Sequence, residues 1–251
     1  MRILLHQLRS EQLVFWRSRE AAIFIFIFPL MLFVLLGSVY DGTAEVRGRS
    51  FPVADVLLTG LMGYGAANTA FAGLAITLVL RREEGLLKRL RATPLPAATY
   101  GAAVLASTLL VFALQAVLLV VLGRVLYGAT LPERPLSLLA AVAVGTLAFA
   151  GLGVGTAALI RSSEGASAVV NVIVLPMAFL SGSFGPTELP RFLAAIADVL
   201  PLKHLLDALQ AITLEQEPVW EQLGSLAVVV AWGVVGLAVA VRRFGWEPRE
   251  R

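Results

Sequence analysis

Long apolar runs separated by short polar segments dominate the chain, and they predict six membrane-spanning helices. A helix needs about 20 apolar residues to cross the hydrocarbon core of a bilayer. The runs that approach this length cover residues 21–39, 53–80, 97–122, 136–160, 166–180 and 223–241. These runs are continuous and do not alternate between apolar and polar residues, which excludes the strands of a closed β-barrel. We therefore predict an all-α integral membrane protein whose spans are numbered one to six in chain order.

The composition supports a membrane protein. Of the 251 residues, 58% are hydrophobic and only 15% are charged, whereas a soluble domain carries about 25% charged residues. The chain has no cysteine and two isolated histidines, so it offers neither disulfides nor the ligand set of a metal site. The net charge of +3 is not gathered into a patch suited to nucleic acid.

The distribution of lysine and arginine predicts the orientation. If residues 1–20 are cytoplasmic, fourteen of the 20 cationic residues lie in cytoplasmic segments. The other six are Arg47, Arg49, Arg124, Arg134, Arg191 and Lys203. Because cytoplasmic loops carry the excess of positive charge, we predict that both termini are cytoplasmic. Residues 21–241 then form one six-span bundle, and residues 242–251 form a cytoplasmic tail.

The first 20 residues have the pattern of an amphipathic helix. Leu4, Leu5, Leu8 and Phe15 lie near one helical face, and the arginines lie elsewhere. Such a helix lies in the membrane interface with its apolar face toward lipid. The alternative is an ordinary charged tail that Trp16 anchors.

The densest charge cluster is "RREEGLLKRLRATPLP", residues 81–96, between spans two and three. Three leucines follow helical spacing, namely Leu86, Leu87 and Leu90. Gly85 permits a tight turn off span two, and Pro94 ends the helix because proline lacks the amide hydrogen. An apolar patch ringed by charge is typical of a helix that docks in a groove of a soluble partner. The alternative is a loop whose charges only set the orientation.

Two further short amphipathic helices are predicted between spans five and six. Leu189, Phe192, Leu193, Ile196 and Leu200 follow one helical repeat, and Leu202, Leu205, Leu206, Leu209 and Ile212 follow another. Pro201 stands at the expected start of the second helix, where proline is tolerated. Both helices are too short to span a membrane, so they form either a re-entrant hairpin or a pair lying flat on the outer leaflet.

Uncharged polar residues occur deep within three spans. Asn68, Gln115 and Asn171 are the amides, with Tyr64 four residues before Asn68 and Ser167 four residues before Asn171. These residues could line a path for cargo, or they could form hydrogen bonds between helices. The deep parts of the spans hold no charged residue, which argues against a carrier driven by protons or sodium ions.

Two motifs carry a resemblance to a known family. Arg82-Glu83-Glu84-Gly85, followed by Leu90 and Thr93-Pro94, resembles the loop after the second span of ABC type-2 transporter permeases. These permeases are the membrane subunits of ATP-driven exporters. Residues 180–209 resemble the family signature after the fifth span, with Gly182, Pro186, Pro190 and Pro201 in the expected order. The chain looks most like the drug and antibiotic exporter branch.

The resemblance implies a role for each of these segments. A coupling helix to a separate ATPase subunit would comprise Glu83, Gly85, Leu86, Leu87, Arg89, Leu90, Thr93 and Pro94. Cargo, a hydrophobic or amphipathic small molecule, would pass Tyr64, Asn68, Gln115, Ser167 and Asn171. A re-entrant hairpin would form near the outer exit at Gly182, Pro186, Pro190 and Pro201. The permease would work as a homo- or heterodimer in a bacterial cytoplasmic membrane.

The sequence itself also indicates that nucleotide binds on another subunit. A phosphate-binding loop needs the pattern GxxxxGK[ST], and this chain contains no Gly-Lys pair. ATP and Mg²⁺ are therefore expected on the partner subunit, and this chain is not expected to be an enzyme by itself. Gly151 and Gly155 have instead the GxxxG spacing that allows close packing of helices in a membrane.

Three alternatives remain beside a drug or antibiotic exporter. The first is a permease for lipid or lipid-linked polysaccharide. The second is a membrane assembly factor of the same fold that moves no cargo. The third is a secondary carrier driven by an ion gradient.

Overall fold

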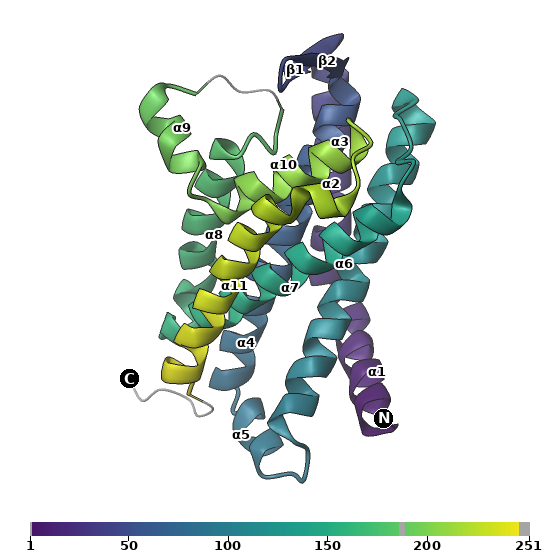
Figure 1. Ribbon diagram of the computed structural model, residues 1–251. Coiled ribbons are helices and arrows are strands. Elements are labelled where there is room, and N and C mark those ends of the chain that lie inside the picture. The colour runs from purple at the N-terminus through teal and green to yellow at the C-terminus, as the bar shows by residue number, and fades with distance from the viewer. Residues whose placement is uncertain (1, 186–188, 246–251) are drawn as a thin grey trace.

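The computed structural model describes residues 2–185 and 189–245, and it confirms the six predicted spans (Figure 1). Within these residues, six helices are long and apolar enough to cross a membrane. Five spans are single helices: α2 (Arg19–Val39), α6 (Ala97–Tyr127), α7 (Pro135–Leu159), α8 (Ser163–Leu180) and α11 (Leu223–Arg243). The second span, Val53–Glu83, consists of α3 (Val53–Ala66), the π-helix η1 (Ala67–Gly73) and α4 (Leu74–Glu83).

Glycines allow the backbones of α7 and α11 to touch, as the GxxxG spacing predicted. A Cβ atom on Gly151 would lie 2.6 Å from the carbonyl oxygen of Gly233, and one on Gly155 would lie 2.4 Å from that of Gly236. No side chain fits at these distances, so only glycine permits this approach. α7 also contacts η1 and α4, which makes it the central helix of the bundle.

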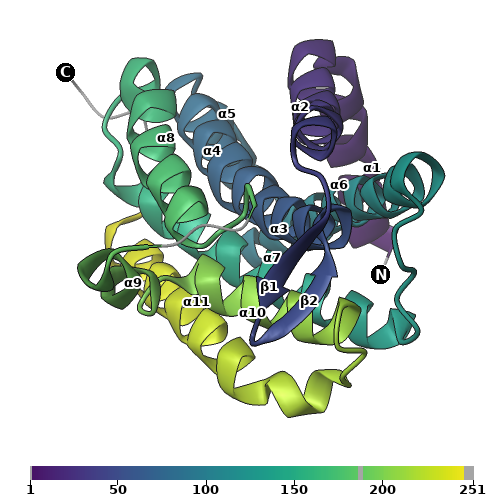
Figure 2. The same ribbon diagram turned by 90° about the horizontal axis from the view of Figure 1, so that it is seen from above.

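The π-helix in span two was not predicted. A Cβ atom on Gly153 of α7 would lie 2.8 Å from the carbonyl oxygen of Phe71, so this glycine admits the wider backbone of η1. Seen from above, α2 and α8 stand on either side of span two (Figure 2). Both flanking helices therefore pack against span two.

The N-terminal segment forms α1 (Arg2–Arg17), which confirms the predicted helix, and it packs against α6. Of the four residues on its predicted apolar face, Leu5 is exposed and Leu4, Leu8 and Phe15 are half-buried, whereas Glu11 is buried. The side-chain amide of Gln12 donates hydrogen bonds to the hydroxyl and the carbonyl oxygen of Ser107, at 2.8 and 3.1 Å. Polar contacts therefore fix α1 to the bundle.

The short helices after span five are confirmed as α9 (Arg191–Ala197) and α10 (Pro201–Thr213), and a 3₁₀-helix η2 (Val219–Gln222) follows. Pro190 directly precedes α9, and Pro201 begins α10 as predicted. The leucines of α10 are buried because this helix packs against α11, α3 and α7, so α10 lies within the bundle. Gly182 has a positive φ of 78° in the turn after α8. Pro186 lies outside the described residues.

A β-hairpin between spans one and two was also missed by the pattern. Strands β1 (Thr43–Val46) and β2 (Arg49–Pro52) pair antiparallel with Val46 opposite Arg49. Arg47 and Gly48 both have positive φ, as the two-residue turn of a tight hairpin requires. The guanidinium groups of Arg47 and Arg49 contact the carboxylate of Glu215, just after α10, at 3.3 and 3.4 Å.

Glu215→Gln is expected to loosen the β-hairpin. Loss of the two ion pairs, whose arginines are exposed to solvent, removes about 1 kcal/mol, which corresponds to about fivefold faster amide hydrogen exchange in residues 43–52. Hydrogen-exchange mass spectrometry of the purified protein measures this change. Glu45→Gln, on the exposed side of the hairpin itself, is the matched control. Equal exchange rates in the two variants would show that Glu215 does not hold the hairpin.

Candidate functional site

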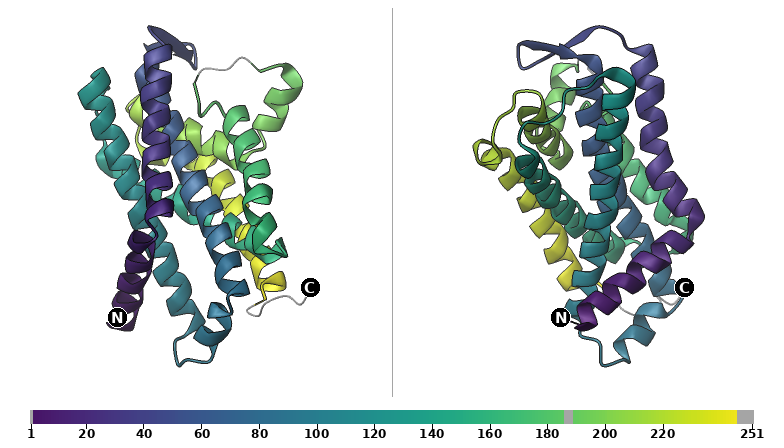
Figure 3. Two further views of the ribbon diagram at one scale, coloured as in Figure 1. Left: turned by 180° about the vertical axis from the view of Figure 1, so that it is seen from behind. Right: turned by 90° about the vertical axis from the view of Figure 1, so that its right-hand side faces the viewer.

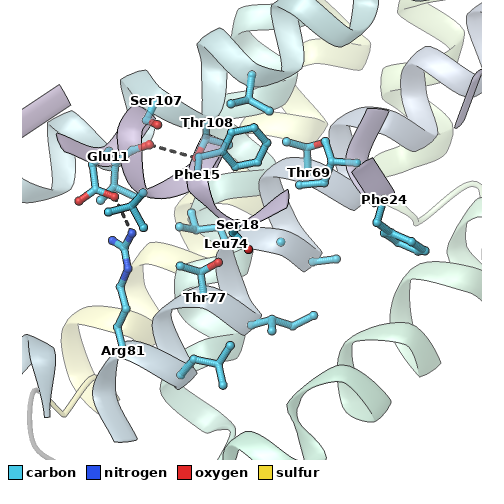
Figure 4. Close-up of a pocket in the computed structure, with 18 of the residues that line it drawn as sticks. Glu11, Phe15, Ser18, Phe24, Thr69, Leu74, Thr77, Arg81, Ser107 and Thr108 are labelled. Carbon is cyan, nitrogen blue, oxygen red and sulfur yellow. Dashed lines mark hydrogen bonds and ion pairs between the residues drawn. The ribbon is translucent and has the colours of Figure 1, made fainter. Parts of the chain in front are cut away.

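A cavity of about 710 Å³ lies beside span two. Its boundaries are η1, α4, α6, α8 and the bend between α1 and α2 (Figure 4). Apolar side chains such as Phe15 and Phe24 form much of its lining. Its uncharged polar residues are Ser18, Asn68, Thr69, Thr77, Ser107, Thr108, Ser167 and Asn171. This mixture suits a ligand that has both apolar surface and hydrogen-bonding groups.

The cavity brings together three of the residues predicted to line a cargo path. Asn68 comes from η1, midway along span two, and Ser167 and Asn171 come from α8. Within the part of the chain that the structure describes, no hydrogen bond engages the side-chain amide of Asn68 or of Asn171. Both amides can therefore donate and accept hydrogen bonds with a bound molecule.

The other two predicted residues, Gln115 and Tyr64, pack between helices and do not line this cavity. The side-chain carbonyl of Gln115 accepts a hydrogen bond from the hydroxyl of Thr69 at 3.0 Å, and Gln115 is completely buried. The ring of Tyr64 contacts Phe28 and Phe184, with centroids 6.2 and 5.1 Å apart. Their geometry favours the interhelical alternative that the sequence left open.

The π-helix places Asn68 and Thr69 on the cavity lining. An extra residue per turn widens the backbone and changes the direction of the side chains, and such segments are frequent at functional sites. No residue pattern in span two signals this geometry, because Gly153, which permits it, contacts η1 from α7, a distant part of the sequence.

A buried ion pair closes the end of the cavity nearest α1. The carboxylate of Glu11 accepts hydrogen bonds from Arg81 at 2.7 Å and from Gln7 at 3.0 Å. Arg81 also donates to the hydroxyl of Tyr100, at 2.8 Å, so α1, α4 and α6 meet in one network. Figure 4 shows Glu11 and Arg81 facing each other at this end. Neither the role of Glu11 nor that of Arg81 was predicted from the sequence, since only the fold brings residues 70 positions apart together.

The predicted helix between spans two and three is confirmed as α5 (Leu86–Arg91). Gly85, with a φ of 70°, separates it from α4. The hydroxyl of Thr93 donates to the carbonyl oxygen of Leu90 at 2.6 Å, at the end of the helix, and Pro94 follows. α5 and the loop after it project beyond the neighbouring helices (Figure 3).

The leucines of α5 do not all face outward. Leu87 is 0% exposed and belongs to the core of this chain, and Leu90 is half-buried against the same core. Leu86 is 37% exposed and Arg89 is exposed. The surface that α5 offers to a partner is therefore mainly cationic, with Leu86 as its apolar part. Leu86 also lines the cavity, so α5 adjoins it directly.

Arg82 and Glu83, just before α5, hold the ends of two other helices. Arg82 is 1% exposed and donates to the carbonyl oxygens of Ala157 and Ile160 at the end of α7, at 3.0 and 2.7 Å. The carboxylate of Glu83 accepts from the backbone amide of Ser163, at 2.8 Å, and from its hydroxyl. A cation at a helix C-terminus and an anion at an N-terminus each stabilise by up to about 2 kcal/mol in partly buried sites.

Comparison with known proteins gives two matches. A family model described as ABC-2 type transporter matches residues 4–214. The chain is also 26% identical over 197 residues to the linearmycin resistance permease protein LnrN of Bacillus subtilis (strain 168). The aligned region is 78% of this chain and 48% of that protein, so the chain spans about half the length of the curated relative it matches.

Proposed function

This chain belongs to the ABC-2 type transporter family, and from that premise we propose that it is the permease subunit of an ATP-driven exporter. Its cargo is a hydrophobic or amphipathic small molecule of antibiotic-like character. ATP and Mg²⁺ bind on a separate ATPase subunit, and α5 is the segment that contacts it. The similar protein of Bacillus subtilis is a linearmycin resistance permease, which supports an antibiotic-like cargo.

The continuity between the cavity and α5 is the observation that carries this proposal. The cavity lining runs from Asn68 and Asn171, both midway along their spans, to Leu86 on α5. A partner that pushed on α5 would therefore act directly on one end of a cavity large enough for a small molecule. α1 begins, and α11 ends, at the same end of the bundle as α5 (Figure 3), as the predicted cytoplasmic side requires.

We place a second permease copy beside α2 and α8. These helices flank span two and expose large apolar side chains, including Phe24 and Ile27 on α2 and Val172 and Phe179 on α8. In a dimer, the second copy would enclose the cavity on its open side. The complex then has two permeases and two ATPase subunits in a bacterial cytoplasmic membrane.

Affinity purification from native membranes in a mild detergent, followed by mass spectrometry, tests the proposal. We expect an ATPase with a GxxxxGK[ST] loop in near-equal amount, and amphipathic drugs should stimulate ATP hydrolysis by the reconstituted complex. An ATPase without any stimulation by drugs or lipids would favour the assembly factor. Stimulation by lipid alone would favour the lipid or polysaccharide exporter. Capture of no ATPase, under conditions that preserve a known transporter complex, would contradict the proposal.

Asn68→Leu and Asn171→Leu are expected to change the cargo preference of the complex without reducing its assembly. Each variant removes an amide that faces the cavity and leaves the helix packing unchanged, so the concentration for half-maximal drug stimulation should rise about tenfold for hydroxyl-rich drugs. Gln210→Leu is the matched control, since it replaces a buried amide on α10 that does not line the cavity. An equal shift in all three variants, or loss of the dimer in the first two, would show that these amides serve packing.

A further inference from the structure

The segment before α5 carries a second link to the cavity. We infer that Glu83 is a positioning residue that ties α8, one wall of the cavity, to the end of span two, so that movement of α5 is passed to α8. This inference rests on the proposed function and gives Glu83 a role other than contact with the ATPase. Glu83 belongs to α4, and the left-handed Gly85 separates it from α5.

The contact of Glu83 replaces a cap that α8 lacks. Ser162 stands at the N-cap position with an extended backbone, but its side chain makes no capping hydrogen bond. The carboxylate of Glu83 accepts instead from the first backbone amide of α8 and from the hydroxyl of Ser163. The unpaired amides of a helix's first turn normally find a side-chain acceptor in the helix's own N-cap residue, which bonds the second or third amide. Here it comes from another span, so the cap is also a link between helices.

Arg82, the residue before Glu83, makes a similar contact with the end of α7, the helix that precedes α8. Its guanidinium donates to Ala157, in the last turn of α7, and to Ile160, in the turn before α8. Two adjacent residues of span two therefore hold both sides of the α7–α8 connection. The charges match the helix ends, with a cation at a C-terminus and an anion at an N-terminus. Movement of the end of span two must carry this connection with it.

The face of α8 above Glu83 is the cavity wall. Ser163, Ser167 and Asn171 are spaced four residues apart, so they lie on one side of the helix. The first is held by Glu83, and the other two line the cavity. A displacement at Ser163 therefore shifts the polar groups that face the cargo. Leu86, on α5, lines the same cavity and is three residues from Glu83.

Single-molecule FRET on the reconstituted complex tests this link without knowledge of the cargo. The chain has no cysteine, so Ile173→Cys on α8 and Val125→Cys on α6, at positions 42% and 73% exposed, accept the two dyes specifically. Ile173 lies about 100° around α8 from Val172, which we place against the second copy. Labelled permease is diluted with unlabelled permease so that one complex carries one dye pair. ATP with vanadate is the probe, and the labelled complex must hydrolyse ATP as the unlabelled one does.

We expect a shift in FRET efficiency when nucleotide is trapped, and Glu83→Leu should remove it. The ATPase subunit should still co-purify, with hydrolysis within about twofold of the wild type, because the carboxylate of Glu83 is engaged by Ser163 of α8. Ser163→Ala, which removes only the hydroxyl, should reduce the shift. Ser162→Ala and Glu20→Gln are matched controls at a neighbouring serine and at an exposed glutamate, and both should leave the shift unchanged.

A double variant separates the link from simple capping. Ser162→Asp, made in the Glu83→Leu variant, supplies α8 with its own N-cap. This cap restores stability if Glu83→Leu folds poorly. It does not restore the contact between span two and α8. The FRET shift should stay absent. Its return would show that Glu83 only caps α8, and a persistent shift in Glu83→Leu would also overturn the inference. Loss of the ATPase subunit in Glu83→Leu would make Glu83 a docking residue, whereas failure of the wild type to capture an ATPase would refute the proposed function itself.

Discussion

Gly155→Ala is expected to lower the free energy of unfolding by about 3 kcal/mol, the upper end of the cost of overpacking a core. The added Cβ atom would lie 2.4 Å from the carbonyl oxygen of Gly236 and 2.8 Å from its Cα atom. These are backbone atoms, so no rotamer change can relieve the clash and α7 must separate from α11. Gly155→Leu, which adds three further carbon atoms, should prevent recovery of monodisperse protein. Thermal unfolding and size-exclusion chromatography in detergent measure the two effects.

Gly101→Ala on α6 is the matched control for this prediction. No atom outside its own helix and its chain neighbours lies within 4 Å of the Cβ position at Gly101, so the same substitution should be neutral or stabilise by up to about 1 kcal/mol through helix propensity. Similar unfolding temperatures for Gly155→Ala and Gly101→Ala would contradict the close packing of α7 on α11. The contrast tests the central contact of the fold with one methyl group.

Features that depend on the local sequence were predictable. The six spans follow from the length and apolarity of their segments. The spacing of Gly151 and Gly155 predicts a close helix contact because it puts both glycines on one helical face. α5 follows from a leucine repeat bounded by Gly85 and Pro94. In each case the physical cause lies within one segment, so the sequence contains it.

Features that depend on distant contacts were not predictable. The width of η1 is permitted by Gly153 on another helix, and Leu87 is buried because the bundle covers it. The resemblance made Arg82 part of a family motif and Glu83 part of the expected coupling helix, yet in the structure they hold the ends of α7 and α8. Charge at the end of a span has several uses, and only the fold shows which backbone groups need a partner.

In the candidate site, too, local features were predictable from the sequence and features that depend on distant contacts were not. Asn68 and Asn171 were predicted because an amide deep in an apolar span requires a hydrogen-bonding role. Gln115 has the same signal but a different role, since Thr69 stands next to it. The sequence shows that an amide is present at depth, and the neighbouring helices decide whether it faces a cavity or another side chain.

Arg89→Glu combined with Arg91→Glu is expected to reduce co-purification of the ATPase subunit at least about tenfold. Both side chains are exposed on the projecting α5, and truncating or reversing one desolvated interfacial charge costs about 2–5 kcal/mol. Folding should be unchanged, because the buried contact of α5 is made by Leu87. Quantitative mass spectrometry of the purified complex gives the ratio of ATPase to permease.

Arg2→Glu combined with Arg9→Glu is the control that decides how this result is understood. It reverses two exposed arginines of α1, the helix that begins at the same end of the bundle as α5, so it matches the change in net charge and in the charge that orients the chain. Loss of the ATPase in the α5 variant alone would identify α5 as the docking element. Equal loss in both variants would mean that general charge or insertion was disturbed. Normal co-purification of the α5 variant would show that the partner binds elsewhere, and the charges on α5 would then serve only the orientation of the chain.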